Sequence, residues 1–154
     1  MEFSRLVKKR KMIREYSNRV VPKDVIGRLL QYAAHPPSAG HTLPCRAIVI
    51  TDLGVKELLC THAWNQEWVK NAPVVIAIVS DVLKSGAKYG TRGITRYSFI
   101  DGAFYAMLLH LGAVDLGLAS CFVGAFSDLQ VRDALGLSAQ EIPIGLLCVG
   151  YAYE

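Results

Sequence analysis

The sequence contains 154 residues, of which 52% are hydrophobic, and it carries a net charge of +4. This length fits a single domain over residues 1–154, with one core and no linker. The richest apolar stretches, residues 73–80 and 100–118, are interrupted or too short to cross a bilayer, so we expect no membrane partner. Excess apolar surface instead indicates a subunit interface. The N-terminus lacks the apolar run of a secretory signal, which predicts a cytoplasmic protein.

Several common kinds of site are missing from the sequence. The four histidines are not spaced as paired ligands on one helix face, so we expect no metal site. The cysteines Cys45, Cys60, Cys121 and Cys148 form no Cys-x-x-Cys pair, and we expect reduced, mostly buried thiols. Neither GxGxxG after a strand nor the P-loop pattern GxxxxGKS/T occurs, which argues against a Rossmann dehydrogenase and a P-loop nucleotide site.

Two helices are the first elements expected in chain order. Residues 3–12 predict a weakly amphipathic helix. Pro22 then opens a stronger helix, in which apolar residues recur at helical spacing. This second helix should stop before the proline pair at residues 36 and 37, because the residue before a proline disfavours helical geometry.

Two buried strands are expected next, over residues 47–51 and 74–79, because both runs are β-branched and bounded by Pro, Asp or Gly. A short helix over residues 54–62 should connect them. Residues 81–97 contain three glycines and show no clear period, which predicts a loop or lid. Such loops often carry functional residues.

The last third of the chain predicts a helix, a strand, a helix and a strand. Residues 101–116 are apolar on nearly every side, which indicates a central buried helix. Residues 119–123 and 144–149 read as strands, and a capping box that starts at Ser127 predicts a helix over residues 128–135. Helices are therefore expected to surround a sheet of about four strands.

A cluster of cations lies where the first helix is expected to end, and residues 8–14 read KKRKMIR. If that helix continued, Arg10 and Arg14 would lie one turn apart, and two guanidinium groups at that spacing could hold one phosphate. A solvated basic face would give the same pattern, and a basic patch also suits nucleic acid. Because the excess charge is local, an anionic small molecule fits it at least as readily as nucleic acid.

Five segments, in the same order along the chain, resemble segments of the FMN-dependent nitroreductase family. In this chain they read RKMIREY from residue 10, PSAGHTLPC from 37, APVVI from 72, LGLASCFVGAF from 116 and VGY from 149. The family segments read RRSxRxF/Y, PSAGNxQPW, APVVI, LGLGSCWxGAF and GY. Because the five segments span nearly the whole chain, it is identified as a small member of this family.

The resemblance implies a nitroreductase-like α+β fold, a three-layer α/β/α sandwich around a central mixed sheet. It implies FMN as cofactor and NADH or NADPH as co-substrate, which passes a hydride to flavin N5 and then leaves. An organic acceptor such as a nitroaromatic or a quinone would bind the same face in a ping-pong scheme. The flavin carries the chemistry, so no catalytic side chain is expected. The resemblance also implies a homodimer with the flavin at the subunit interface, where residues 101–116 would form either interface or plain core.

The resemblance also implies a set of cofactor-binding residues. Residues 10–14 would hold the phosphate and ribityl end, and residues 37–41 of the partner subunit would lie along the flavin. Asn65 would meet the flavin pyrimidine, although a surface Asn would look the same. The backbone N–H groups of residues 123–124 would face the N5 and O4 edge, which is compatible with a plain strand-to-helix turn. The complete set is Arg10, Lys11, Met12, Arg14, Pro37, Ser38, Ala39, His41, Asn65, Val123 and Gly124.

Four positions depart from the family segments. Met12 stands where Ser is usual, His41 and Leu43 stand where Asn and Gln are usual, and Cys45 stands where Trp is usual. The loss of these polar groups leaves a non-enzymatic flavin carrier or sensor with the same fold as the alternative function. The tyrosines and arginines of residues 81–97 are candidates to contact the nicotinamide or the acceptor, or else plain exposed loop residues.

Overall fold

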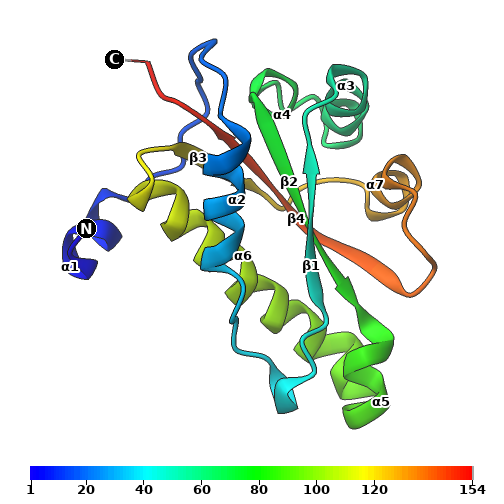
Figure 1. Ribbon diagram of the computed structural model, residues 1–154. Helices are drawn as coiled ribbons and strands as arrows, with labels where there is room; N and C mark the ends of the chain where they lie inside the picture. The colour runs from blue at the N-terminus through cyan, green and yellow to red at the C-terminus, as the bar shows by residue number, and fades with distance from the viewer. Residues whose placement is uncertain (154) are drawn as a thin grey trace.

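The computed structural model describes residues 1–153, which form a four-stranded sheet between two layers of helices (Figure 1). The strands follow the order β1-β2-β4-β3 across the sheet. Every neighbouring pair is antiparallel, so the expected mixed sheet is wrong in this respect. The hydrophobic pattern of a sequence indicates which strand residues are buried. It does not indicate whether neighbouring strands run parallel or antiparallel. The strands are β1 (Cys45–Ile50), β2 (Val74–Asp81), β3 (Ala119–Val123) and β4 (Glu141–Gly150).

The helices confirm most of the expected elements. In Figure 1, α2 and α6 cover one face of the sheet, and α3, α4 and α7 cover the other face. This arrangement is the three-layer α/β/α sandwich that the family resemblance implies. The helices are α1 (Phe3–Lys9), α2 (Lys23–Tyr32), η1 (Ala39–His41), α3 (Leu53–His62), α4 (Trp68–Asn71), α5 (Val82–Arg92), η2 (Gly93–Tyr97), α6 (Ser98–Asp115) and α7 (Asp128–Leu135).

The two faces of the sheet hold separate cores, and not the single core expected, because side chains alternate along β2. Ile76 and Ile78 are fully buried against the α2 and α6 layer, while Val75 and Val79 are fully buried against the α3, α4 and α7 layer. Each such side chain contributes roughly 1.5–3 kcal/mol by its removal from water. The unbroken apolar run of residues 74–79 therefore belongs to a strand whose two faces are both buried.

The predicted start of α7 at Ser127 is confirmed, but only half of the capping box forms, because the Ser127 backbone N–H donates to the His62 carbonyl over 2.9 Å. The Ser127 hydroxyl accepts the backbone N–H of Gln130, with the two atoms 3.5 Å apart. Gly136 ends the helix in the left-handed conformation, with a φ of 63°. The predicted boundaries of this helix follow from these two local signals.

The expected loop over residues 81–97 is instead helical, so this prediction is wrong. α5 leads directly into the π-helical turn η2, and Gly90, within α5, breaks the helical geometry with a φ of 59°. A Cβ on Gly93 would meet the backbone carbonyl of Ser85, so a glycine is needed for the two segments to pack this closely. The glycines that resemble loop residues in the sequence therefore allow close helix packing.

The helical run from Val82 to Asp115, which includes the kink at Gly90, is long and apolar enough to cross a membrane by length and composition alone. Core helices pass the same test, and half of its most apolar window is buried within the fold. The α6 part of this run packs across the sheet, with Leu109 fully buried. The apolar character of α6 is therefore accounted for, in part, by the core of the molecule.

The four cysteines are free, and Cys60, Cys121 and Cys148 are buried, as expected. Cys45 is partly exposed. Burial raises the pKa of the Cys148 thiol well above its ordinary value. A thiol that stays protonated is a poor nucleophile, so Cys148 is a packing residue of the core.

Candidate functional site

The basic segment of residues 10–14 runs along the free edge of β3, the outermost strand at that side of the sheet. The backbone N–H of Ile13 donates to the Ser120 carbonyl over 2.9 Å. The backbone N–H of Phe122 donates to the Met12 sulfur over 3.4 Å. β3 therefore positions this segment through contacts at two points along its edge.

Arg10 and Arg14 point to opposite sides of the sheet. α1 ends at Lys9, and Arg10 is not helical, with a φ of −59° and a ψ of 125°. The two arginines are therefore not neighbours on one helix face, which differs from the arrangement considered in the sequence analysis. Arg10 Nη1 lies 3.2 Å from His110 Nε2 on the α6 side. The Arg14 guanidinium carbon lies 5.1 Å from the centre of the Trp68 ring on the α4 side. A ligand that meets both arginines must therefore reach around the edge of β3, from one face of the sheet to the other.

Three cavities adjoin this segment. One of about 400 Å³ lies at Arg14, and the other two differ in chemistry. The first of these two, about 240 Å³, lies between Lys9, Lys11 and the start of β3 at Ser120. Cations and a hydroxyl suit a phosphate group. The second cavity, about 190 Å³, has mainly apolar walls and suits an aromatic ring. The second cavity is lined by Met12, Ala103, Ala106, Met107, His110 and Phe122.

The segment of residues 37–41 lies at the other end of α6, beside α5. The backbone N–H of Ala39 donates to both carboxylate oxygens of Asp101, each 3.2 Å away. The Ser38 hydroxyl accepts the backbone N–H of Leu43 over 3.0 Å. The loop is therefore fixed by its own hydrogen bonds and by the start of α6. The exposed predicted residues of this loop are Pro37 and His41.

A second contact of this loop comes from the region expected to be a lid. Lys88 Nζ, on α5, donates to the Gly40 carbonyl over 3.1 Å. Gly40 has a φ of 57°, and a Cβ there would meet the Lys88 side chain. Asp101 and Lys88 are thus two residues that hold the loop and that the sequence reasoning did not single out. No local pattern marks them, because each contact joins distant parts of the chain.

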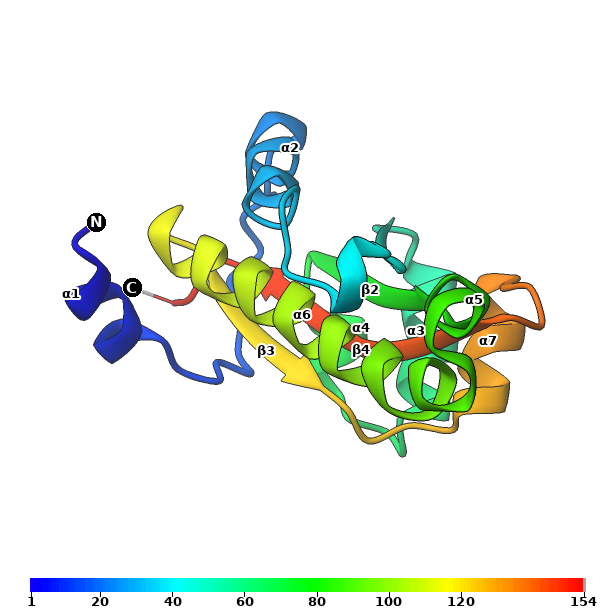
Figure 2. The same cartoon turned by 90° about the horizontal axis from the view of Figure 1, so that it is seen from below.

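The predicted site residues of these two segments therefore lie apart within one chain. Asp101 and His110 are nine positions apart on α6, which corresponds to roughly 14 Å along the helix axis. Figure 2 shows the same separation from below, with α1 at one end of the molecule and α5 toward the other. One chain alone does not place residues 37–41 against residues 10–14.

A third group lies at the far end of β3. Val123 is the buried last residue of that strand, and Gly124 is exposed just beyond it. Asn65 is exposed in the turn after α3, with a φ of 57°. The Gln66 side-chain amide donates to the Ala125 carbonyl over 2.8 Å, which ties the turn of Asn65 to the turn of Gly124. The structure thus brings these two predicted segments together, and Gln66, which joins them, is a further residue missed in the sequence.

His110 is a buried polar residue that also emerges only from the structure. Its Nε2 faces Arg10, and its Nδ1 lies 2.6 Å from the Ser120 hydroxyl. Burial, reinforced by the positive charge of Arg10, lowers the pKa of His110 to about 4. The ring is therefore neutral near pH 7. In the sequence His110 stands alone on an apolar helix, and Arg10 is 100 positions away.

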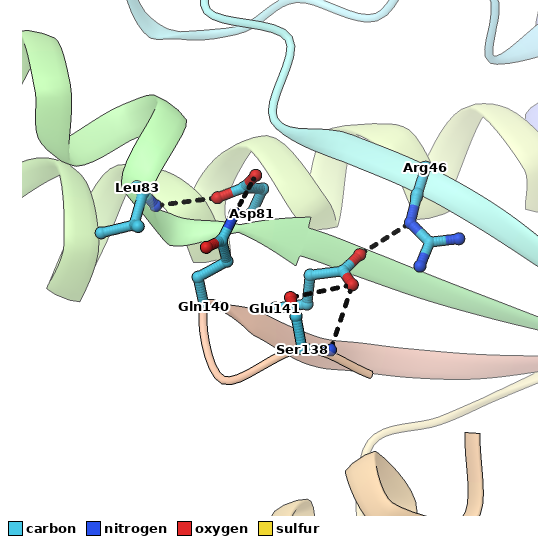
Figure 3. Close-up of polar contacts among 6 residues, drawn as sticks. All are labelled: Arg46, Asp81, Leu83, Ser138, Gln140 and Glu141. Atoms are coloured by element: carbon cyan, nitrogen blue, oxygen red, sulfur yellow. Dashed lines mark hydrogen bonds and ion pairs between the residues drawn. The ribbon is translucent and has the colours of Figure 1, made fainter. Parts of the chain in front are cut away.

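A separate polar cluster near the start of α5 is structural (Figure 3). Arg46 Nε pairs with the Glu141 carboxylate over 2.7 Å, and this lowers the pKa of Glu141. The Asp81 carboxylate caps the start of α5 by accepting the backbone N–H of Leu83. It also accepts a hydrogen bond from the side-chain amide of Gln140. These carboxylates already have protein partners, so the cluster stabilises strand ends and is not a candidate site.

Comparison with known proteins assigns the fold and the family. The family model described as "Nitroreductase family" matches residues 7–65 and 55–151. The NADH dehydrogenase of Thermus thermophilus is 29% identical over 95% of this chain and 84% of its own length. Human iodotyrosine deiodinase 1 is 28% identical over 97% of this chain, which spans 61% of the deiodinase.

A solved structure supports the same fold and family. The structure of a nitroreductase family protein from Clostridium difficile 630 has a TM-score of 0.87 and 30% identity, and covers 100% of this chain and 86% of its own. The predicted nitroreductase-like fold is thereby confirmed. Members of this family are oxidoreductases that are generally flavin-dependent and dimeric. The sheet, the two helical layers and the match over nearly the full chain show that this protein belongs to the nitroreductase family.

Proposed function

We propose that this protein binds FMN and transfers a hydride from NADH or NADPH, through the flavin, to an organic acceptor such as a nitroaromatic or a quinone. One observation carries the proposal. The basic segment of residues 10–14 lies along the free edge of β3, between a cation-lined cavity and an apolar cavity. An elongated ligand with an anionic end and a flat apolar ring matches that sequence of environments.

The residues present fit FMN in chemical terms. Lys9 and Lys11 supply cations to the first cavity, and Arg10, between them in the sequence, contacts His110 and has donors to spare. Met12 and Phe122 contribute apolar walls to the second cavity, where the isoalloxazine ring is expected. Met12 replaces the hydroxyl that the family usually has here, so the phosphate contacts are assigned to the cations.

The protein's own residues would bind and orient the cofactor. FMN, when bound, supplies the hydride acceptor and donor. Arg14, on the α4 side, is assigned with Asn65 to the far end of the flavin, and this revises the expectation that Arg14 meets the phosphate. The backbone of Val123 and Gly124 would face the ring edge, where fixed N–H dipoles tune a flavin without side-chain chemistry. No side chain is assigned a catalytic role.

A homodimer would complete this site. Apolar side chains form a stripe on the outer face of α6, where Ile100, Phe104 and Met107 are 42%, 46% and 47% exposed. Their spacing of four and three residues places them on one helix face. A second copy packed on this stripe would remove it from water and could bring its own loop of residues 37–41 to the flavin, which one chain does not do. We assign the stripe to the dimer interface.

The nicotinamide and the acceptor are assigned to the side of the site nearest α5 and η2. Arg92 Nε donates to the Tyr97 hydroxyl over 2.8 Å, and the rings of Tyr89 and Tyr97 pack edge to face with centres 5.1 Å apart. π-Helical turns such as η2 often occur at functional sites. An ordered cluster of aromatic and cationic side chains can hold a flat, charged co-substrate.

The decisive experiment is an absorbance spectrum of the purified protein during anaerobic titration with NADH and with NADPH. We expect FMN absorbance that bleaches with one of the two reductants and returns when a nitroaromatic or a quinone is added. A protein that gains no flavin absorbance when FMN is added would refute FMN binding. A bound flavin that neither reductant bleaches would favour the carrier or sensor over the enzyme.

A further inference from the structure

His110 occupies an unusual position for a histidine on an apolar helix. It is 2% exposed, and both ring nitrogens have a protein partner. Nε2 lies 3.2 Å from Arg10 Nη1, and Nδ1 lies 2.6 Å from Ser120 Oγ. The three side chains come from the segment after α1, from α6 and from β3.

The partners determine which ring nitrogen carries the proton. A guanidinium has five N–H donors and no acceptor, and it stays charged at every accessible pH. Arg10 must therefore donate, and His110 Nε2 must accept. The proton then sits on Nδ1, which donates to the Ser120 hydroxyl. A doubly protonated ring would turn an N–H and a positive charge toward Arg10 in a buried position, so the arrangement requires neutral His110.

The same contacts fix the basic segment at two points. Ser120 accepts the His110 N–H at its hydroxyl and the Ile13 N–H at its backbone carbonyl. Arg10 is held through His110, and Ile13 is held directly. Ser120 also lines the cation-lined cavity with Lys9 and Lys11. His110 lines the apolar cavity, so the Arg10 guanidinium is anchored by a residue that lies between the two cavities.

We propose that His110 is a positioning residue, which holds the Arg10 guanidinium through its Nε2 lone pair so that the remaining Arg10 donors face the anionic end of the flavin. This inference rests on the proposed function. One Arg10 N–H is used by His110, which leaves four for a ligand. Fixing a long side chain before the ligand arrives lowers the entropy cost of binding.

The charges around His110 agree with this role. Arg10 is the charged group that faces the ring, and Lys9 and Lys11 line the adjoining cavity. Asp115, further along α6, pairs with the N-terminal amino group and with Tyr32. Among the residues that the structure describes, no carboxylate is bonded to His110, so nothing offsets the charge that protonation would add.

The test compares FMN with riboflavin, which lacks the phosphate, in binding titrations of the full-length protein. His110→Phe keeps a planar ring in the wall of the apolar cavity but offers no acceptor, and we expect it to weaken FMN binding about tenfold more than riboflavin binding, because the hydrogen bond that holds the charged Arg10 is lost. His110→Gln, which offers an amide oxygen to Arg10, should restore part of the FMN affinity. Arg10→Ala combined with His110→Phe should bind FMN no more weakly than Arg10→Ala alone.

Equal loss of FMN and riboflavin affinity in His110→Phe, or effects that add in the double variant, would show a purely structural role and overturn the proposal. A wild-type protein that binds neither flavin would refute the proposed function. A wild-type protein that binds FMN with the same affinity as His110→Phe would refute the positioning role alone.

A second measurement does not depend on flavin, and its main result requires only the wild-type protein. Nitrogen-15 NMR of the histidine side chains in the flavin-free protein reports the tautomer. We expect His110 to carry its proton on Nδ1 at neutral pH, and we expect Arg10→Ala to shift the Nε2 resonance. A His110 ring with its proton on Nε2, or with two protons, would contradict the arrangement on which the proposal depends.

Discussion

The carboxylate of Asp101 accepts the backbone N–H of Ala39 with both oxygens, each 3.2 Å away. Asp101 is 3% exposed, at the start of α6, and burial raises the pKa of its carboxyl group. A buried side chain on a rigid helix therefore fixes the position of a loop that is itself mostly at the surface. This loop is the part that a partner subunit is proposed to present to the flavin.

Replacing Asp101 by Ala should therefore destabilise the loop and the fold together. The change leaves the Ala39 N–H without its acceptor, and the expected loss is about 1–3 kcal/mol in the free energy of unfolding. Urea denaturation measures the loss. Asp101→Asn retains one oxygen acceptor and should lose less. Equal stability of the Ala variant and the wild-type protein would show that this contact contributes nothing.

The stability of the protein should fall as the pH is lowered from about 6.5 to about 4, in part because of His110. Its pKa is depressed from 6.5 to about 4 in the folded chain, so in this interval the unfolded chain binds the proton and the folded chain does not. Stability present at neutral pH is then lost progressively on acidification. The expected contribution is on the order of 3 kcal/mol.

The contribution of His110 to this pH dependence can be isolated by comparing variants. His110→Gln should show a weaker pH dependence of the free energy of unfolding than the wild-type protein, whereas His35→Gln, at an exposed position, should match it. Asp101 has a raised pKa and acts in the opposite direction, but it is present in all three proteins. Identical pH dependence in the wild-type and His110→Gln proteins would contradict the prediction.

Arg14→Ala should lower FMN occupancy more than it lowers stability. Arg14 is exposed, and its contact with Trp68 is a cation–π interaction worth about 0.5–1 kcal/mol at such a site. Loss of a ligand contact to a guanidinium should weaken FMN binding about tenfold. The ratio of flavin to protein after purification, together with urea denaturation, tests both parts. Arg28→Ala, an exposed arginine on α2, is the matched control.

Gln66→Ala should loosen the end of the site near Gly124. Gln66 donates from the same side-chain amide to the Ala63 and Ala125 carbonyls, over 2.9 and 2.8 Å. Its removal frees the turn that carries Asn65 and should weaken FMN and riboflavin binding by similar factors, because the phosphate end is untouched. A selective loss of FMN binding would place this turn at the phosphate instead.

Phe104→Glu should shift the protein from dimer to monomer. Phe104 is 46% exposed in the apolar stripe of α6, so a charge there costs little in one chain and much in an interface. Sedimentation velocity measures the change, and loss of FMN binding should accompany it. The control is Leu129→Glu on α7, which is 66% exposed and lies in the opposite helical layer. A dimer that survives Phe104→Glu would move the interface elsewhere.

The elements most readable from the sequence are those specified by local chemistry. The N-cap Ser127 and the glycine at residue 136 determine both ends of α7. The β-branched run of β2 is buried on both sides, as its composition indicates. The helical region from α5 to η2 escaped prediction because the role of Gly93 depends on a contact with Ser85, eight positions earlier, which has no local signature.

The candidate site is less readable, since it depends on contacts between distant residues. The family segments in the sequence point to Arg10 and Arg14, but only the fold shows that they lie on opposite sides of the sheet. His110 and Asp101 stand alone on an apolar helix in the sequence, and each acquires a role through a partner at least 62 positions away. Periodicity and local motifs do not encode such pairs.

The attachment of residues 12 and 13 to β3 has a consequence for solubility. An outermost strand presents backbone donors and acceptors on which another chain can assemble as an added strand, and such edges promote aggregation. Here the Ile13 N–H occupies the Ser120 carbonyl, and the Met12 sulfur occupies the Phe122 N–H. The segment proposed to recognise the cofactor thus also shields the sheet from self-association. A change that detaches this segment would therefore yield a protein that is not merely short of flavin but also more prone to precipitate.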